Sequence, residues 1–430
     1  METKEIFETL MQNLKVGETA SMVATRREAI ARSLNKEFRD LSGSTDNTLM
    51  VGSYGRHTAI KGISDLDMLY YLPEELREGY LSSESGPRKA LDRVKVALQK
   101  TYSTTNNIRV DRCIVALQFS SNKFRFEIQP VFREKDGSFT YPDTYTKSWK
   151  NTKPLEEKAA TRECNRRTSN NMRHLARMIR AWRNNVGLAM CGLLIDTLVY
   201  NFFQQEKLYD SAGPGKYDEM VRDFFNYLAK LPEQTRYLAL GSNQHVKVND
   251  KFQNKAKKAL KICETAIENE SKDIALTEWR KVFGGALTAK AKRTDGSFTD
   301  TEEFIENLYP VDIKESVKID CKMYHAKFRP LWLKKDILAR RQKILHPYSL
   351  HFYITECSVN EPYDVKWKVL NRGPIAEIRD SIRGEISEPN SSENARLETA
   401  DFGGNHRVEC YILKDKIVVA RDSIQVPIKV

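Results

Sequence analysis

The sequence predicts an α+β protein whose chain runs through three parts: a mixed α/β part, a helical part and a β-rich part. Three observations predict this order. Short apolar strands and a helical pattern share residues 1–150, helical periodicity dominates residues 151–304, and strand-like composition returns over residues 305–430. A length of 430 residues suits two or three domains. We therefore expect a domain boundary at each of the two changes in pattern.

The first part is expected to contain one long helix and four strands. Apolar residues spaced four and three apart predict a helix over residues 23–41. Strands are expected at residues 48–51, 68–72, 114–119 and 124–132. The polar link Ser120–Lys123 suits a hairpin between the last two strands.

Helices are expected to fill the second part and strands the third. Leu175, Met178 and Trp182 share one face of a helix in the second part. Further helices are expected at residues 191–203, at residues 217–231 and, as one or two helices, within residues 251–283. In the third part, strands are expected at residues 349–355, 363–369, 406–413 and 417–420. Turn signals lie at Asn371–Pro374 and Asp401–Asn405, and a polar loop is expected at residues 387–394.

Composition excludes several classes of protein. With 40% hydrophobic and 30% charged residues, the chain resembles folded globular proteins rather than disordered ones. Its seven cysteines are scattered, odd in number and contain no Cys-x-x-Cys pair. This argues against a disulfide framework and against a structural zinc site. A reducing, cytoplasmic compartment is therefore expected.

Hydropathy and charge limit the partners. The N-terminus lacks the apolar core of a signal peptide, and Asp196 interrupts the longest apolar stretch, Leu188–Phe203, so no membrane insertion is expected. The net charge of +12 indicates a polyanionic partner: nucleotide, nucleic acid or an anionic membrane surface. A solvated basic surface without a specific partner is the alternative.

A turn rich in glycine and serine carries the clearest functional signal. Gly52 and Gly55 let the backbone approach a bulky anion closely, and Ser53 offers a hydroxyl and a backbone N–H. Residues 54–60 are expected to start a short helix whose first N–H groups face that anion. Arg56 adds a positive charge. The pattern predicts a phosphate-binding loop.

Two carboxylates follow this loop at the start of a strand. Asp65 and Asp67 share one strand face because they are two residues apart, roughly 6.6–6.8 Å along the backbone. Such a pair can bridge metal ions about 3.5–4 Å apart, which polarise a phosphoryl centre and activate an attacking hydroxyl. Two aspartates at this spacing are common, so the prediction of a metal site depends on the preceding loop and on a third carboxylate.

A third carboxylate is expected from the strand over residues 124–132. Apolar residues alternate along it and leave Arg125, Glu127 and Gln129 on the opposite face. A charged residue flanked by apolar neighbours on a core strand is costly unless it is paired or bound to a metal. Glu127 is therefore the expected third ligand. Taken alone, it would be read as an exposed strand residue.

A family resemblance joins these signals. Gly52-Ser53, Thr58, Ile60 and Asp65-Leu66-Asp67 resemble the signature of the cGAS/DncV-like nucleotidyltransferases, the CD-NTase or SMODS family of the polymerase-β superfamily. The resemblance implies a polymerase-β-like nucleotidyltransferase core over residues 1–150, with three catalytic metal ligands: Asp65, Asp67 and Glu127. It also implies four nucleotide-binding residues: Gly52, Ser53, Arg56 and Thr58. The family's third acidic residue is more often Asp, so Glu127 departs from the usual pattern.

The resemblance extends along the chain. Asn170, Arg177–Trp182 and Leu193–Tyr200 resemble the family's nucleotide-facing helices, and Trp279–Gly284 resembles the segment that closes its catalytic module. Core packing is the alternative for most of these residues. Four later segments resemble the AGS-C domain, a proposed sensor: Phe352–Thr355, Pro362–Val369, Arg383–Ile386 and Gly404–Tyr411. These likenesses imply a helical nucleotide-binding domain over residues 151–304 and a β-rich AGS-C-like sensor domain over residues 305–430.

The function that the resemblance implies is synthesis of a signal in anti-phage defence. The enzyme would use Mg²⁺, or Mn²⁺, to join NTPs or dNTPs into a cyclic or linear oligonucleotide with release of pyrophosphate. Its partners would be the nucleoside triphosphates, a nucleic acid or other activator, and a separate effector protein that responds to the product. Two alternatives stay open: a template-independent enzyme that extends a primer or an RNA end into a linear polymer, and a non-catalytic nucleotide sensor.

Overall fold

The computed structural model describes residues 2–16, 19–62, 64–102, 107–119, 124–269, 272–287, 303, 305–309, 311–325, 328–345, 348–371, 384–400 and 403–429. The chain divides into two compact units. Unit 1 comprises Met1–Trp182 and Cys191–Leu287, and unit 2 comprises Arg183–Met190 and Thr288–Val430. Unit 1 spans most of the ranges predicted for the first two domains, and the division into three domains stays a prediction.

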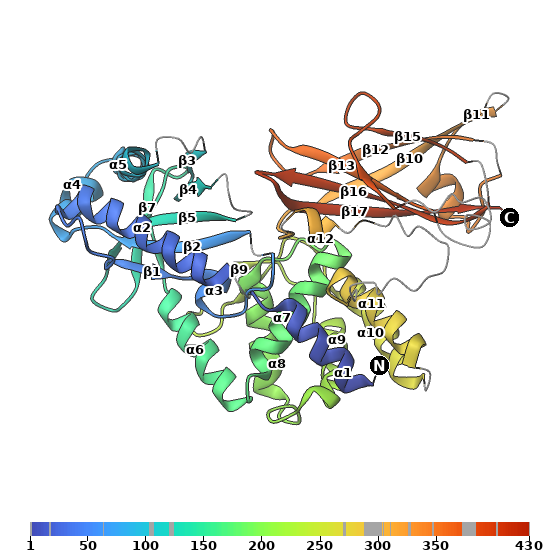
Figure 1. The fold of residues 1–430 in the computed structure, drawn as a ribbon, viewed down its shortest axis with the longest axis horizontal. Coiled ribbons are helices and arrows are strands. Elements are labelled where there is room, and N and C mark those ends of the chain that lie inside the picture. The colour runs from blue at the N-terminus through green and yellow to red at the C-terminus, as the bar shows by residue number, and fades with distance from the viewer. Residues whose placement is uncertain are drawn as a thin grey trace. The chain divides into compact units, whose positions relative to one another are not determined.

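A mixed sheet of seven strands frames the site in unit 1 (Figure 1). Its strands are β1 (Thr48–Met50), β2 (Asp65–Tyr71), β3 (Ile108–Asp111), β4 (Ile114–Gln118), β5 (Arg125–Arg133), β6 (Phe139–Asp143) and β7 (Ser148–Thr152). Their order is β1-β2-β5-β4-β3, with β6 paired to β5 and β7 to β6. β2 and β5 run parallel, and the other pairs are antiparallel. The starts of β2 and β5 therefore lie side by side.

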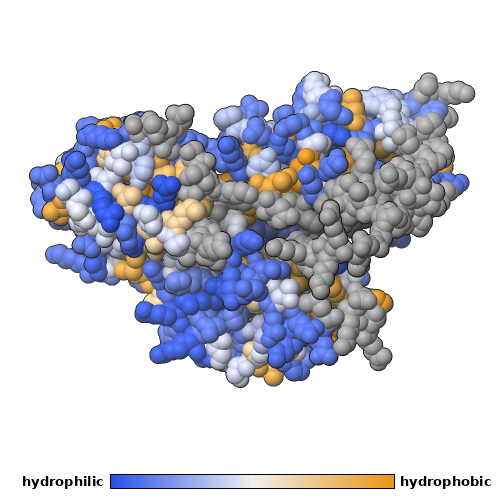
Figure 2. Space-filling view, viewed as in Figure 1, coloured by the Kyte–Doolittle hydropathy of each residue, from blue (hydrophilic) through white to orange (hydrophobic). Residues whose placement is uncertain are grey.

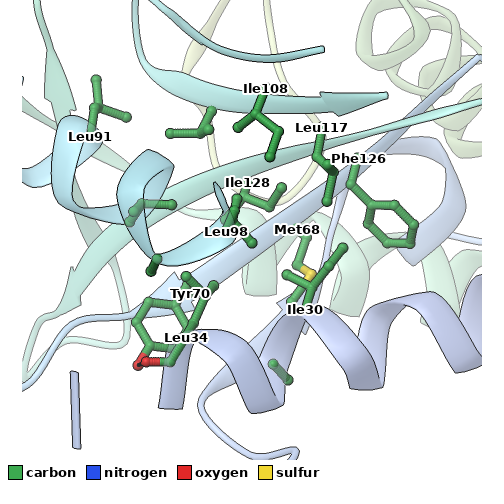
Figure 3. Packing of buried hydrophobic residues seen from close by; sticks show 14 of the residues in the cluster. Ile30, Leu34, Met68, Tyr70, Leu91, Leu98, Ile108, Leu117, Phe126 and Ile128 are labelled. Atoms are coloured by element: carbon green, nitrogen blue, oxygen red, sulfur yellow. Dashed lines mark hydrogen bonds between the residues drawn. The ribbon is translucent and has the colours of Figure 1, made fainter. Parts of the chain in front are cut away.

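Two helices, α2 (Thr19–Arg39) and α5 (Gly86–Thr101), pack against one face of this sheet (Figure 3). Leu34 of α2 and Leu91 of α5 are fully buried in this core. Alternate residues of the central strands point into it: Leu66, Met68, Tyr70, Phe126 and Ile128. The intervening residues of β2 and β5 consequently lie on the opposite face.

Helices make up most of the remaining described part of unit 1. They are α1 (Thr3–Leu14), α6 (Pro154–Arg167), α7 (Asn171–Val186), α8 (Gly192–Gln205), α9 (Tyr217–Lys230), α10 (Gln253–Glu268) and α11 (Lys272–Phe283). The last turn of α7 belongs to unit 2. The short elements are α3 (Gly52–Gly55), η1 (Glu74–Leu76), α4 (Arg77–Leu81), η2 (Pro214–Lys216), β8 (Arg236–Leu238), β9 (His245–Lys247) and η3 (Gly284–Leu287). The ring of Phe7 in α1 lies 5.0 Å from Trp279 and 6.2 Å from Tyr217. The N-terminal helix therefore belongs to the helical layer.

Two four-stranded antiparallel sheets form the body of unit 2 (Figure 1). The first has the order β11-β10-β12-β15, formed by β10 (Val317–His325), β11 (Phe328–Trp332), β12 (Ser349–Cys357) and β15 (Arg396–Thr399). The second has the order β14-β13-β16-β17, formed by β13 (Asp364–Leu370), β14 (Ile386–Ser387), β16 (Gly404–Lys414) and β17 (Ile417–Ile428). Both sheets contribute to one core, in which Phe352 and Trp367 are buried. A short helix, α12 (Ile305–Leu308), and a π-helical turn, η4 (Leu333–Leu338), complete the described part of unit 2.

The expected fold class, α+β, is confirmed. The helices and strands that the sequence predicts within the described residues are present, with shifted ends. The short helix expected from residue 54 is a single turn that begins at Gly52, and β14 takes the start of the expected polar loop. Elements that the sequence analysis missed include α5, β10 and β11. Several predicted features lie outside the described residues: the link Ser120–Lys123, the turn residues Arg372–Pro374 and Asp401–Phe402, and Arg383.

The described surface is mostly hydrophilic on the face that Figure 2 shows, in line with the 30% of charged residues. Hydrophobic residues are scattered among them in small groups. Across the described ranges, no helix is both long and apolar enough to cross a membrane.

Candidate functional site

The pairing of β2 with β5 sets the geometry of the site. Asp65 lies beside Arg125 and Asp67 beside Glu127 in the parallel register. All four side chains lie on the sheet face opposite α2 and α5, because the residues between them point into that core. The structure therefore brings the three predicted carboxylates to one face of two adjacent strands.

Arg125 lies between two of these carboxylates. Its Nε is 2.9 Å from Oδ1 of Asp65, and its Nη2 is 2.6 Å from Oε1 of Glu127. Asp65 is buried, whereas Arg125 and Glu127 keep 16% and 17% of their side chains exposed. One guanidinium is thus shared by two of the three acidic groups in this structure.

Asp67 is held against the predicted phosphate loop. The N–H of Val51 donates to the backbone oxygen of Asp67 at 2.9 Å. Gly52 follows with φ +59°, and a Cβ at this position would lie 1.7 Å from Oδ2 of Asp67. Only glycine fits here, since any side chain would overlap the carboxylate. The loop and the second predicted metal ligand are therefore in direct contact.

The loop itself is one helical turn closed by backbone hydrogen bonds. The N–H groups of Thr58 and Ala59 both donate to the oxygen of Ser53, at 2.9 and 3.2 Å. A Cβ at Gly55 would lie 2.4 Å from the oxygen of Met50, so this second glycine is also required by close packing. Ser53 itself is partly exposed, as a residue that meets a ligand must be.

A buried ion network braces this loop from behind. Arg56 donates through Nε to Asp196 at 2.8 Å and through Nη1 to Glu157 at 3.1 Å. The hydroxyl of Thr58 donates to the same Asp196 carboxylate at 2.9 Å. Arg180 adds two hydrogen bonds to Asp196, at 2.7 and 3.0 Å. The side chains of Arg56 and Thr58, predicted to bind nucleotide, are thus engaged in holding the loop to α8.

Burial makes this network costly to break. Asp196 is fully buried, and Arg56 and Arg180 are nearly so. Burial alone would raise the pKa of the Asp196 carboxyl, but the guanidiniums of Arg180 and Arg56 hold this pKa below its usual value. The carboxylate is therefore ionised and shared between two cations. The sequence offered one signal for it, an aspartate within an otherwise apolar helix, which served in the sequence analysis only to exclude a membrane span.

Basic side chains from α6 and α7 contact the backbone at the two ends of the loop. Arg177 Nη2 donates to the oxygen of His57 at 2.9 Å, and Lys158 Nζ donates to the oxygen of Met50 at 3.1 Å. Burial and the charges of Arg173, Lys158 and Arg177 lower the pKa of His57. The Nε atoms of Arg173 and Arg177 are buried and have no hydrogen-bond partner among the described residues. A bound anion would be attracted to this group.

The three carboxylates are not gathered into a finished metal site. In the part of the chain that the structure describes, no three His, Cys, Asp or Glu side chains are placed to hold a metal ion together. Arg125 engages two of the predicted ligands instead. The donor chemistry nevertheless fits a divalent cation, because carboxylate oxygens suit Mg²⁺ and a positive group already lies between Asp65 and Glu127.

Comparison with known families matches both ends of the chain. Residues 1–165 match the Second Messenger Oligonucleotide or Dinucleotide Synthetase (SMODS) domain. Residues 299–429 match the Adenylyl/Guanylyl and SMODS C-terminal (AGS-C) sensor domain. The first match contains the glycine–serine loop and all three carboxylates, and the second lies within unit 2.

Relatives and solved structures agree with these matches. A cyclic AMP-AMP-AMP synthase of Acinetobacter sp. is 23% identical over 323 residues, which cover 70% of this chain and 90% of the relative. A probable cyclic nucleotide synthase of Bacillus cereus is 24% identical over 273 residues, covering 54% and 80%. Escherichia coli CdnC, solved in complex with HORMA-deltaN, matches with a TM-score of 0.52 at 15% identity, covering 67% of this chain and 99% of that one. CdnC with ATP matches with a TM-score of 0.51. At this identity the structural likeness concerns the fold.

Proposed function

Because the chain belongs to the cGAS/DncV-like nucleotidyltransferases and carries an AGS-C domain, we propose that it joins nucleoside triphosphates into a cyclic or linear oligonucleotide signal and releases pyrophosphate. The observation that carries this proposal is the β2–β5 register. It lines up Asp65, Asp67 and Glu127 on one sheet face, next to the loop at Gly52 and Ser53. Residues 1–150 and 151–304 would form the catalytic and nucleotide-binding parts, and residues 305–430 a sensor-like module.

The three carboxylates are proposed to hold the metal. Asp65, Asp67 and Glu127 would bind Mg²⁺ or Mn²⁺, which would polarise the reacting phosphoryl group and neutralise its charge. Glu127 would lie near the attacking hydroxyl and accept its proton. Arg125 would serve as the counter-ion of Asp65 and Glu127 when no metal is bound, which the distances of 2.9 and 2.6 Å support.

The loop and the basic side chains are proposed to hold the triphosphate. Gly52 allows its close approach, and Ser53 would donate a hydrogen bond to it. Arg56 and Thr58 would support binding indirectly, since their side chains hold the loop through Asp196. Arg173 and Arg177 would attract the phosphates, since their buried Nε atoms have no hydrogen-bond partner among the described residues.

The first test is product formation. Purified protein is incubated with each labelled NTP and dNTP plus Mg²⁺ or Mn²⁺, and products are identified by mass spectrometry; ATP comes first because of the named product of the Acinetobacter relative. Asp65→Asn with Asp67→Asn should abolish product while the melting temperature is kept, because both carboxylates are proposed ligands. Asp92→Asn, in a half-exposed pair with Arg88 on α5, is the matched control. Wild-type turnover in the double variant would refute the site.

The same products separate the alternatives. A primer requirement and a growing linear ladder would identify an enzyme that extends ends, and no incorporation under any condition would favour a nucleotide sensor. The defence role is tested in cells that carry this enzyme together with the effector protein that is proposed to respond to its product. Phage plating should rise when the wild-type enzyme is replaced by the double variant, and equal plating would count against that role.

A further inference from the structure

A basic segment of unit 2 takes no part in the site above. Residues 318–343 contain nine lysine and arginine residues and only two acidic ones, Asp320 and Asp336. This short segment supplies more than half of the net charge of +12. It forms most of β10, all of β11 and the turn η4, so the charge is concentrated on three consecutive elements.

The strands direct a particular set of side chains outward. Ile319, Cys321 and Met323 of β10 are fully buried in the core of unit 2, so Lys322 and Tyr324 point to the other face of the sheet. In the register, Lys322 lies between Trp332 of β11 and His351 of β12. These residues therefore form a row across three neighbouring strands.

Aromatic rings remain exposed in this row. Tyr324 is 39% and Trp332 38% exposed. Nζ of Lys322 lies 5.4 Å from the centroid of each of these two rings. On the adjacent strand, the rings of His351 and Tyr353 are 6.1 Å apart. We call these five residues the aromatic–basic face.

Backbone N–H groups engage both acidic side chains of the segment. Asp320 accepts from the N–H of Cys321 at 2.7 Å and from that of Lys334 at 3.2 Å. Asp336 accepts from the N–H of Trp332 at 2.8 Å. These bonds fix the turn that carries Trp332, so the exposed indole is held in place before any partner binds.

We propose that the aromatic–basic face binds single-stranded nucleic acid, with bases stacked on Trp332 and Tyr324 and phosphates near Lys322. Exposed rings and interleaved cations match the two features of such a ligand, flat bases and a regular negative charge. A duplex hides its bases from the rings, and a base-free polyanion offers nothing to stack. A protein partner would not need so dense a positive charge. The ligand is distinct from the triphosphates at the carboxylates of unit 1.

Binding is measured on the full chain with fluorescein-labelled single-stranded dT and rU 12-mers, by fluorescence anisotropy in EDTA so that no product forms. A duplex of the same length and unlabelled polyphosphate are the competitors. Both single strands should bind, with weaker duplex binding and weak competition by polyphosphate. Tighter binding of dT than of rU would identify DNA as the natural ligand, and the reverse would identify RNA.

Variants assign the site. Trp332→Ala and Tyr324→Ala should each weaken binding about fivefold or more, since a stacked base contributes measurably to affinity. Tyr145→Ala is the matched control, because Tyr145 is 84% exposed and has Arg112 over its ring at 5.3 Å, but lies in unit 1. Trp332→Phe keeps a ring and should retain most binding, which separates lost stacking from misfolding.

The proposal would be overturned by unchanged binding of the alanine variants, equal affinity for duplex or full competition by polyphosphate. Loss of binding in the variant that lacks both the Asp65 and Asp67 carboxylates would overturn it as well. Failure of every oligonucleotide to bind would also overturn it and would leave the face to a protein partner. Synthase activity is measured separately, so the outcome of the binding experiment does not depend on whether the proposed reaction is correct.

Discussion

Two groups of ion pairs in unit 1 share charge in opposite ways. Behind the loop, one carboxylate, Asp196, lies between two guanidiniums, and all three groups are almost completely buried. On the sheet face, one guanidinium, Arg125, lies between two carboxylates and stays partly exposed. A charge left without its partner is most costly where it is fully buried, and the cost falls where water reaches the group. The first group is thus suited to hold the loop in one conformation. The second is suited to exchange the Arg125 guanidinium for a metal ion.

The comparison is tested most strongly at Glu127. Glu127→Gln should lower turnover about a thousandfold or more, close to 4 kcal/mol of activation free energy, because a proposed metal ligand loses its charge. Stability should change little. Steady-state product formation and thermal melting check both. Glu134→Gln, a partly exposed acid just beyond the end of β5, is the control. If turnover fell only a few fold, Glu127 would be a solvated strand residue rather than a metal ligand.

The buried network should show the opposite pattern. Asp196→Asn leaves Arg56 and Arg180 without a full counter-charge, and we expect a loss of about 3–5 kcal/mol in the free energy of unfolding. Urea unfolding measures this loss. Asp210→Asn, which removes a more exposed partner of Arg167, should cost far less. If the two variants were equally stable, the network would not brace the loop.

Ser53 belongs to neither group, and its substitution distinguishes an effect on binding from an effect on stability. Ser53→Ala should weaken binding of a non-hydrolysable triphosphate by about 1.5–3 kcal/mol, the contribution of a hydrogen bond to a charged acceptor. The melting temperature without ligand should stay the same. Isothermal titration calorimetry of Ser53→Ala beside Ser83→Ala, at a partly exposed serine away from the loop, checks this. Unchanged affinity would reduce the loop to a simple turn.

The smallest effect is expected at Arg125. Arg125→Gln removes a positive charge that competes with a metal, so Mn²⁺ should bind up to about fivefold more tightly, close to 1 kcal/mol. Without metal, the variant should melt at a lower temperature than the wild type, because Asp65 and Glu127 lose their counter-ion. Electron paramagnetic resonance titration with Mn²⁺ and melting in EDTA measure the two effects, with Arg88→Gln as control. Weaker Mn²⁺ binding would mean that Arg125 helps to hold the ligands.

The sequence predicted what local periodicity determines. Alternation along a strand was enough to put Asp65 and Asp67 on one face, and to put Glu127 beside Arg125 on its own strand. It could not give the register of β2 with β5, which depends on pairing between distant segments. For the same reason Arg56 was predicted to meet phosphate: its partner Asp196 lies 140 residues away in the chain.

Two elements without a sequence prediction, α5 and β10, have clear sequence patterns. Helix α5 carries Ala90, Leu91, Val94 and Leu98 at helical spacing, all buried in the core, and the pattern was readable. The alternation of Ile319, Cys321 and Met323 in β10 was equally visible. The exposure of Trp332 was not, because tryptophan is usually buried on average and only the folded sheet shows which side it faces.

Gly52 has a consequence for how this enzyme can vary. Most glycines with positive φ tolerate an asparagine at the cost of some backbone strain. Gly62 is such a position, because its φ is +83° and a Cβ there would meet open space. At position 52 the missing methyl group is the clearance between the loop and the carboxylate of Asp67. A saturation library should therefore leave a single permitted amino acid at position 52 and several at position 62. A substitution at Gly52 would therefore be tolerated only together with a compensating change at Asp67.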